Sequence, residues 1–300
     1  PRAAPREPWW VASYSALRTV KGTPETSGTP DTPDEDVFRE ALAEPEPEAG
    51  SARPAPFSVH AFPRGAAPGT FLHDLLEWAA REGFAAVAAD PVRLAGEVGR
   101  RLAPRGWEAW QAPLTDWLRT LITTPLPLPD GGACALADAA ALSPELEFWL
   151  SAGRVDTPAL DALVRAHTLD GAARPALEPR RLSGMLKGFI DLVFEHDGRY
   201  YVVDYKSSWL GPTEAAYTPE AMRAAVLEER YELQYVLYLF ALHRQLRARL
   251  PGYDYDRHVG GAAYVFLRGI DAPSRGVHVE RPPRALIEAL DDLFSAEVPA

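Results

Sequence analysis

Cysteine is almost absent from this 300-residue chain, which contains Cys134 alone. A single thiol cannot form an intramolecular disulfide, and it cannot complete a thiolate zinc site or a cysteine-held iron–sulfur cluster. The chain also lacks any run of eighteen apolar residues, and its first ten residues lack the apolar core of a signal peptide. We therefore expect a cytoplasmic protein without a membrane segment. The start at Pro1, without methionine, suggests a piece of a longer polypeptide.

Positive charge is scarce relative to negative charge. The chain has 31 Lys and Arg against 42 Asp and Glu, a net charge of −11. Because nucleic-acid affinity comes mostly from Lys and Arg, this balance counts against a free-standing nucleic-acid binder. Each basic cluster of the C-terminal third is open to two interpretations, a path for DNA or a solvated helix face. These clusters are Arg180 and Arg181, Arg244, Arg247 and Arg249, and Arg281 and Arg284.

The chain divides into three parts by composition. Residues 1–21 contain a short apolar segment, with Ser13 or Ser15 placed to cap a helix, which we expect to pack on the main domain. Residues 22–56 are acidic and rich in proline, which predicts a disordered linker because little apolar surface is available to bury. Residues 57–300 are predicted to form one domain with a sizeable core.

The segment Lys187–Trp209 carries the strongest local signal. Two runs rich in β-branched and aromatic residues flank Asp197 and Gly198, and Asp-Gly between such runs predicts a β-hairpin. With these two residues at the centre of the turn, Asp191 lies directly opposite Asp204. Directly opposed side chains point to the same face, with Cβ atoms about 5 Å apart. The hairpin therefore predicts a pair of facing carboxylates.

Opposed like charges destabilise a sheet, so Asp191 and Asp204 predict a compensating cation. Oxygen ligands without nearby thiols favour Mg²⁺, with Mn²⁺ as a substitute. Lys206 returns to the same face, where it would neutralise charge on a reacting phosphate or orient an attacking water. The competing interpretation is a surface hairpin whose aspartates face water. Val193 and Val202 share that face and count against it, since solvated strand faces are more polar.

Helix and strand patterns alternate along the rest of the domain. We expect a mixed α/β sheet with helices on both faces, because helical segments separate the strands and the hairpin. The predicted helices are at about 70–82, 91–138, 159–169, 220–250 and 283–294, and the predicted strands at 145–150 and 260–268.

Further candidate residues lie outside the hairpin. His73, in the first turn of a helix, is by pattern alone more often structural than a ligand. Glu145 and Glu147 share one face of a strand and would supply a further carboxylate if that strand neighbours the hairpin; otherwise they form a polar edge. Gln234 and Tyr238 lie one turn apart on a buried helix. They would bridge to the carboxylates or to a DNA phosphate, or form a plain buried hydrogen bond.

Taken together and in order, these motifs resemble the C-terminal nuclease domain of RecB-type helicase-nucleases, within the PD-(D/E)XK superfamily. A single GxxD or DxK is weak evidence, but the full set at family-like spacing covers most of the chain. The motifs are Phe62–His73 (FPRGAAPGTFLH), Gly188–Asp191 (GxxD), Asp204–Lys206 (DxK), Gln234–Tyr238 (QxxxY) and Gly260–Gly269.

The resemblance implies a restriction-endonuclease-like α/β fold and a metal site. Asp191 and Asp204 would hold Mg²⁺, His73 would be a further metal ligand, and Lys206 would assist the attacking water. Removal of Asp204 is then expected to abolish cleavage and to leave the fold intact or even more stable, since one member of a repelling pair is gone.

The remaining family positions are also implied by the resemblance. The family glutamate best matches Glu145, with Glu147 as the alternative. Gln234 and Tyr238 match the motif that positions the site and the DNA backbone. Ile190 stands where the superfamily name has proline, and the cysteines of the iron–sulfur subgroup are absent.

The implied function is that of a Mg²⁺-dependent exodeoxyribonuclease of the exonuclease V type, acting on single- or double-stranded DNA in double-strand break processing and recombination. RecC-like and RecD-like subunits are the implied partners, with RecA recombinase as a further candidate. No segment matches a helicase P-loop, so unwinding would belong to another part of the protein.

The alternative is a DNA-repair interaction module, for RecA loading or subunit docking, whose nuclease site is weak or partner-dependent; the acidic charge suits protein docking. A nucleotide- or sugar-binding enzyme is disfavoured, since no glycine-rich loop follows a strand.

Overall fold

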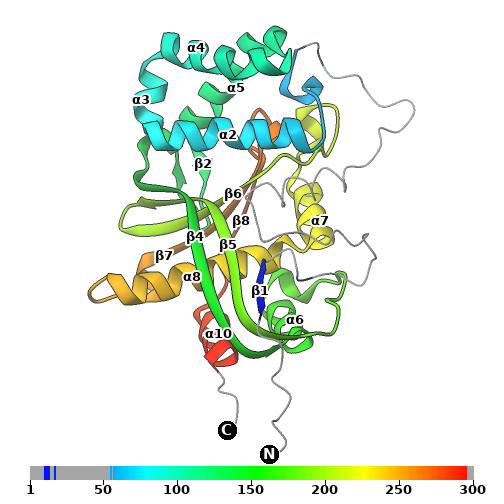
Figure 1. Ribbon diagram of the computed structural model, residues 1–300, viewed down its shortest axis with the longest axis vertical. Helices are drawn as coiled ribbons and strands as arrows, with labels where there is room; N and C mark the ends of the chain where they lie inside the picture. The colour runs from blue at the N-terminus through cyan, green and yellow to red at the C-terminus, as the bar shows by residue number, and fades with distance from the viewer. Residues whose placement is uncertain (1–9, 14–16, 18–54, 56, 296–300) are drawn as a thin grey trace, which may run out of the picture.

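A six-stranded mixed sheet forms the centre of the molecule (Figure 1). The computed structural model describes residues 10–13, 17, 55 and 57–295. The strand order is β1-β5-β6-β7-β8, and β4 pairs with β5 outside this path. The strands are β1 (Trp10–Ser13), β4 (Ala140–Asp156), β5 (Arg181–His196), β6 (Arg199–Lys206), β7 (Val259–Phe266) and β8 (Val277–Glu280). Because β1–β5 and β6–β7 are parallel and the other pairs are antiparallel, the predicted mixed sheet is confirmed.

Helices cover the sheet on two sides (Figure 1). One layer contains α2 (Ala66–Glu82), α3 (Phe84–Ala89), α4 (Pro91–Leu102) and α5 (Gln111–Thr123). The other contains α6 (Thr157–His167), α7 (Pro219–Glu229), α8 (Tyr231–Arg249) and α10 (Arg284–Ser295), and the short α9 (Tyr255–His258) precedes β7. Two core clusters match this division, one beneath α2–α5 and one around α8 and α10. No helix in the described residues is long and apolar enough to cross a membrane.

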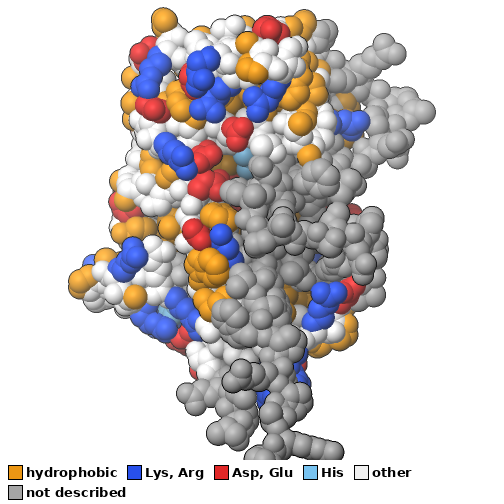
Figure 2. Space-filling model, in the orientation of Figure 1, with side chains coloured by type: hydrophobic (Ala, Val, Ile, Leu, Met, Phe, Trp, Pro, Cys, Tyr) orange, Lys and Arg blue, Asp and Glu red, His pale blue; other side chains and the backbone are white. Residues whose placement is uncertain are grey.

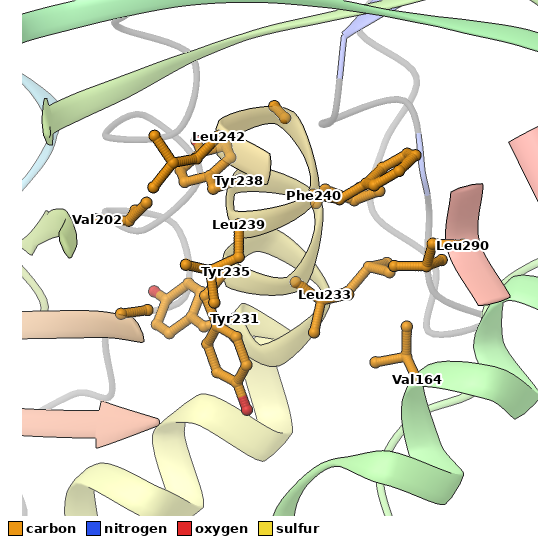
Figure 3. Close-up of a cluster of buried hydrophobic side chains, with 14 of the residues drawn as sticks. Val164, Val202, Tyr231, Leu233, Tyr235, Tyr238, Leu239, Phe240, Leu242 and Leu290 are labelled. Carbon is orange, nitrogen blue, oxygen red and sulfur yellow. The ribbon is translucent and has the colours of Figure 1, made fainter. Parts of the chain in front are cut away.

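Helix α8 is buried on nearly every side. Figure 3 shows Val202 of β6, Leu290 of α10 and Val164 of α6 around the side chains of this helix. A helix that is apolar all round belongs in a core, and its polar side chains then need partners within the protein. The polar groups of α8 are therefore held in fixed positions beneath the sheet.

The predicted hairpin register is confirmed. His196 pairs with Arg199, and the ladder continues to Leu192 and Val203. Asp197 and Gly198 have φ values of 51° and 75°, as a two-residue turn with both central φ values positive requires. The alternating side chains of β6 enter different clusters: Val202 packs on the α8 side, while Val203 packs on the α2–α5 side.

The predicted helix at 220–250 is wrong in one respect, because Arg230 separates α7 from α8 with a left-handed φ of 61°. No glycine or proline marks this break in the sequence. The buried Arg230 guanidinium instead donates to Glu232 Oε1 (2.5 Å) and Asp161 Oδ1 (2.6 Å). These ion pairs offset the backbone strain of a non-glycine residue at positive φ.

Other element predictions also need correction. The pattern at 91–138 is two helices followed by a small hairpin of β2 (Leu126–Pro127) and β3 (Ala133–Cys134). Helix α2 begins after Gly65, one turn before the predicted cap at Thr70, because its Gly-Pro-containing first turn is itself helical. In the N-terminal segment, residues 10–13 form strand β1, which was not predicted. The helix predicted after Ser13 or Ser15 and the linker predicted at 22–56 lie almost wholly outside the described residues.

Candidate functional site

The candidate site lies where β5 and β6 part. The hydrogen-bonded ladder ends at Leu192 and Val203, one pair short of Asp191 and Asp204, so the predicted direct opposition of the two aspartates inside the ladder is wrong. Asp191 Oδ2 instead accepts a hydrogen bond of 2.6 Å from the backbone N–H of Tyr205. The strands diverge because β5 continues between β4 and β1, while β6 continues beside β7. Acidic side chains of β4, β5 and β6 come close together at this divergence.

Glu145 approaches Asp191 from the neighbouring strand. The β4–β5 register runs from Pro144 opposite Leu192 to Leu146 opposite Ile190, which places Glu145 across from Asp191. Glu145 has a positive φ of 49°, a strained conformation of the kind that concentrates at functional sites. The predicted proximity of this strand to the hairpin is therefore observed.

Burial and the Asp191 carboxylate raise the pKa of Glu145 to about 8, with further contributions from Glu77 and Asp204. Glu145 Oε2 is buried and has no hydrogen-bond partner among the described residues. A buried carboxylate oxygen without a partner is unfavourable unless a proton or a cation joins it. This half of the site therefore has an excess of negative charge.

Glu147 has a different environment. Its carboxylate lies on the exposed side of β4, accepts from Trp149 Nε1 (2.9 Å) and pairs with Lys187 Nζ (3.2 Å). The geometry thus places Glu145, and not Glu147, beside Asp191.

Helix α2 contributes His73 to the same place. Its Nδ1 atom lies 3.6 Å from Asp191 Oδ2, and its ring meets the Tyr205 ring edge-on at 6.0 Å. The buried Leu72 and Leu76 anchor this face of α2 in the core and so fix the histidine over the strands. Figure 2 shows acidic side chains and a histidine gathered between α2 and the strands β4 and β5.

Asp204 and Lys206 form a buried ion pair on β6. Asp204 Oδ2 lies 2.7 Å from Lys206 Nζ, and the two residues are 3% and 2% exposed. Lys206 Nζ also donates to Gln234 Oε1 (3.0 Å), and Gln234 Nε2 donates to Tyr238 Oη (2.9 Å). Hydrogen bonds through Lys206 therefore connect Gln234 and Tyr238 of α8 to the Asp204 carboxylate.

Two further residues were not identified from the sequence, Tyr231 and Tyr264. The Lys206 ammonium lies 4.0 Å from the centre of the Tyr231 ring and 5.3 Å from that of Tyr264, and Tyr264 Oη donates to Gln234 Oε1 at 3.0 Å. Aromatic faces stabilise a cation by cation–π attraction. A usable signal existed, since Tyr231 precedes Gln234 by one helical turn and the Tyr264 hydroxyl interrupts an apolar strand.

The donor atoms of the site suit a hard divalent cation. Within the described part of the chain, no three His, Cys, Asp or Glu side chains form a complete metal site by themselves. Mg²⁺ does not need one, since it keeps several water ligands and binds proteins through one or two carboxylates. Glu145 and Asp191 supply such oxygens, and the unpartnered Glu145 oxygen gives the cation a place.

Three arginines of the basic clusters in the C-terminal third pair with neighbouring acidic side chains. Arg244 and Arg247 both donate to Asp291, and Arg284 pairs with Asp254 and Asp256. These pairs favour the interpretation of solvated faces over that of a path for DNA.

Comparison with known proteins defines the class. A model of the PD-(D/E)XK nuclease superfamily matches residues 55–298. The chain therefore belongs to the PD-(D/E)XK nuclease superfamily, and the predicted restriction-endonuclease-like fold and nuclease class are confirmed. Nucleases of this superfamily are in general dependent on a divalent metal.

Among its relatives is the RecB subunit of the RecBCD enzyme of Escherichia coli K12, which is 40% identical over 295 residues covering 97% of this chain and 24% of that protein. The RecB subunit of Haemophilus influenzae is 40% identical over 191 residues, or 62% of this chain and 15% of that protein. The RecB subunit of Mycobacterium tuberculosis H37Rv is 41% identical over 134 residues, or 42% of this chain and 12% of that protein. The predicted resemblance to RecB nuclease domains is confirmed, and the chain spans about a quarter or less of these relatives.

Proposed function

We propose that this chain is the exodeoxyribonuclease domain of a bacterial, cytoplasmic RecB-like helicase-nuclease. It hydrolyses phosphodiester bonds of DNA with Mg²⁺ as its metal, and Mn²⁺ substitutes. One observation carries the proposal. Where β5 and β6 part, the carboxylates of Glu145 and Asp191, which have excess negative charge, lie near the buried Asp204–Lys206 ion pair. Carboxylates for a metal beside an ammonium for a phosphate are what phosphodiester hydrolysis requires.

The roles of the metal-facing residues follow from their positions. Asp191 and Glu145 would bind the metal directly, and Asp204 and His73 would bind it directly or through its water ligands. The bound metal would neutralise these carboxylates and polarise the phosphate to be cleaved. The Tyr205 backbone N–H fixes one oxygen of Asp191, so the orientation of that carboxylate is set before substrate arrives.

Lys206 is proposed to act on the phosphate itself or to orient the attacking water. Asp204, Gln234 and the ring of Tyr231 hold its ammonium, so its long side chain is fixed before the reaction. Preorganised positive charge stabilises the transition state without further reorganisation. Gln234 and Tyr238 then act through the lysine as positioning residues.

The proposed setting is double-strand break processing and recombination, with single- or double-stranded DNA as substrate and RecC-like and RecD-like subunits as partners. The RecB subunit names of the relatives support these partners. The net charge of −11 predicts weak, salt-sensitive DNA binding by the chain alone, which supports reliance on partners.

The same charge supports a second candidate function, an interaction module for RecA loading or subunit docking with a weak nuclease site. Pulldown of RecA and of RecC-like and RecD-like subunits by an Asp204→Asn variant, which keeps its surface, tests this candidate. Capture of these proteins without any cleavage by the wild-type chain would favour it.

The deciding experiment is the degradation of end-labelled linear single-stranded DNA at low salt, with Mg²⁺ or with EDTA. Cleavage should require the metal and should be lost in Asp204→Asn. Asp197→Asn is the matched control, since Asp197 lies on the same hairpin with its side chain 89% exposed. Equal cleavage by Asp204→Asn and the wild type would refute the proposed site.

A further inference from the structure

The outer face of β4 and β5 continues beyond the carboxylates. On the inner face, Phe148 and Leu150 of β4 and Leu186 of β5 pack against the α8 cluster. The intervening residues face the other way and pair across the strands, Trp149 with Lys187 and Glu147 with Phe189. The next pair in this row is Glu145 and Asp191. One row of side chains therefore runs from Trp149 to the candidate site.

This row combines aromatic rings with a cation. Trp149 is 47% exposed and is one of three large hydrophobic side chains exposed in the described part of the chain. Lys187 Nζ lies 5.3 Å from the centre of the Trp149 ring and 4.7 Å from that of Phe189. Figure 2 shows hydrophobic, basic and acidic side chains together over β4 and β5, next to the acidic group beneath α2.

Glu147 fixes this arrangement. Its carboxylate accepts from the Trp149 indole N–H at 2.9 Å and lies 3.2 Å from Lys187 Nζ. The indole is thus held in one orientation although nearly half of it is exposed. The ion pair with Lys187 also offsets the negative charge that Glu147 would otherwise present to a phosphate.

We propose that Trp149, Phe189 and Lys187 form a stacking platform for single-stranded DNA that leads the substrate strand to the carboxylates. The inference rests on the proposed function and names the substrate form that this site takes. Aromatic faces bind exposed bases without regard to sequence, and an adjacent cation binds the backbone. Bases in a duplex are already stacked on one another, so a single strand is the form that such a platform accepts.

The row of side chains from Trp149 leads directly to the candidate site, which favours a DNA strand as the ligand of this face. Trp149 follows Glu145 by four positions along β4, a distance of about 14 Å at about 3.4 Å per residue. Stacked nucleotides rise by a similar distance of about 3.4 Å each. A strand of about four nucleotides therefore spans from the exposed indole to the carboxylates.

The test compares two oligomers that have the same backbone charge and differ only in their bases. Labelled oligo-dT and an abasic oligomer of equal length are titrated with the full chain in EDTA, and binding is measured by fluorescence anisotropy. Wild-type chain should bind oligo-dT more tightly than the abasic oligomer. Trp149→Ala and Phe189→Ala should each weaken oligo-dT binding at least about fivefold, equal to about 1 kcal/mol, and leave abasic binding unchanged.

Conservative and control variants separate stacking from loss of structure. Trp149→Phe keeps an aromatic ring and should retain most of the affinity. Phe57→Ala removes another exposed ring, 54% exposed and packed edge-on against Trp110, and should change nothing. Thermal unfolding of every variant should match the wild type.

Cleavage of the same oligo-dT with Mg²⁺ distinguishes the inference from the proposed function. If the wild type cleaves oligo-dT, but Trp149→Ala and Phe189→Ala bind oligo-dT as tightly as the wild type does, the platform is overturned and the nuclease assignment stands. If the variants lose base-dependent binding but the wild type does not cleave DNA, the result supports the platform and counts against the nuclease assignment. No oligonucleotide binding by the wild type overturns the platform. Variants that bind DNA normally but fail to capture a RecC-like subunit would make this face a protein-docking surface instead.

Discussion

The two halves of the candidate site differ in how their charges are satisfied. On the α8 side, Asp204 and Lys206 form a buried pair that is held further by Gln234 and two tyrosine rings. On the α2 side, Asp191 and Glu145 bring carboxylate against carboxylate, and Glu145 Oε2 has no hydrogen-bond partner in the described structure. In the first half the lysine balances the charge of its carboxylate, whereas the excess negative charge of the second half is balanced by a proton or a cation.

This difference follows from how each half is assembled. Asp204 and Lys206 are two residues apart on one strand, so they share a face whatever the rest of the chain does. Asp191, Glu145 and His73 come from three elements that meet only in the folded protein. A half assembled from distant elements is also the half that can bind and release a ligand from outside.

The largest expected effect is the loss of cleavage when the Asp204–Lys206 half is broken. In Asp204→Asn, Mg²⁺-dependent degradation of linear single-stranded DNA should fall at least about a thousandfold, as it does when a central member of a catalytic group is removed. Asparagine has nearly the same size and shape as aspartate and keeps a polar oxygen near Lys206 Nζ, so the fold should persist. Initial rates are compared with those of Asp197→Asn, and a fall of less than about tenfold would contradict the assigned role.

The second largest effect is expected on stability. Removal of the Asp204 carboxylate should lower the free energy of unfolding, whereas the sequence alone predicts no loss of stability. Asp204→Ala leaves the buried Lys206 ammonium without its carboxylate, and breaking such a pair destabilises by about 3 kcal/mol. Denaturant unfolding in EDTA measures this change. An unchanged or increased free energy of unfolding would restore the view that Asp204 is chiefly one member of a repelling pair.

The Asp191–Glu145 half should make stability depend on pH. The pKa of Glu145 is about 8 in the folded chain against a reference value of 4.5, so the folded state keeps a proton that the unfolded state loses between these values. In EDTA the free energy of unfolding should therefore fall as pH rises from about 5 to about 8. Glu145→Gln should reduce this slope.

Glu147→Gln is the matched control for the pH experiment, since Glu147 lies on the same strand and is exposed. Its slope should equal that of the wild type. A wild-type slope retained in Glu145→Gln would place the titrating group elsewhere in the site.

The smallest effect is expected from Tyr264→Phe. The variant removes one of the donors to Gln234 Oε1 but keeps the ring beside Lys206, so the loss of stability should be about 1 kcal/mol. Cleavage should fall severalfold through kcat, because the lysine is less firmly positioned.

Tyr201→Phe is the control for this change. It removes a hydroxyl that donates to Asp130 at 2.9 Å outside the site, so it should lower stability by a similar amount and leave kcat unchanged. Equal kcat values for the two variants would show that Tyr264 supports the fold alone.

The local parts of the site were predictable from sequence, and the non-local parts were less so. The Asp-Gly turn fixed the pairing of His196 with Arg199 because a two-residue turn admits one register. It did not predict that the ladder stops before Asp191, since that depends on which strands compete for the edges of β5 and β6. Likewise, alternation put Glu145 and Glu147 on one face, but only the β4–β5 register brought Glu145 beside Asp191.

The family, the mixed sheet flanked by helices, and the residue types available for metal and phosphate could all be predicted from the sequence. These features depend on periodicity, turn chemistry and short motifs, which act over a few residues. Which charges find a partner could be seen only in the folded chain, where α8 supports the Asp204–Lys206 pair and α2 with β4 surrounds Asp191 with further polar groups. The physical reason is that desolvation and pairing energies depend on neighbours far away in the chain, which no local pattern specifies.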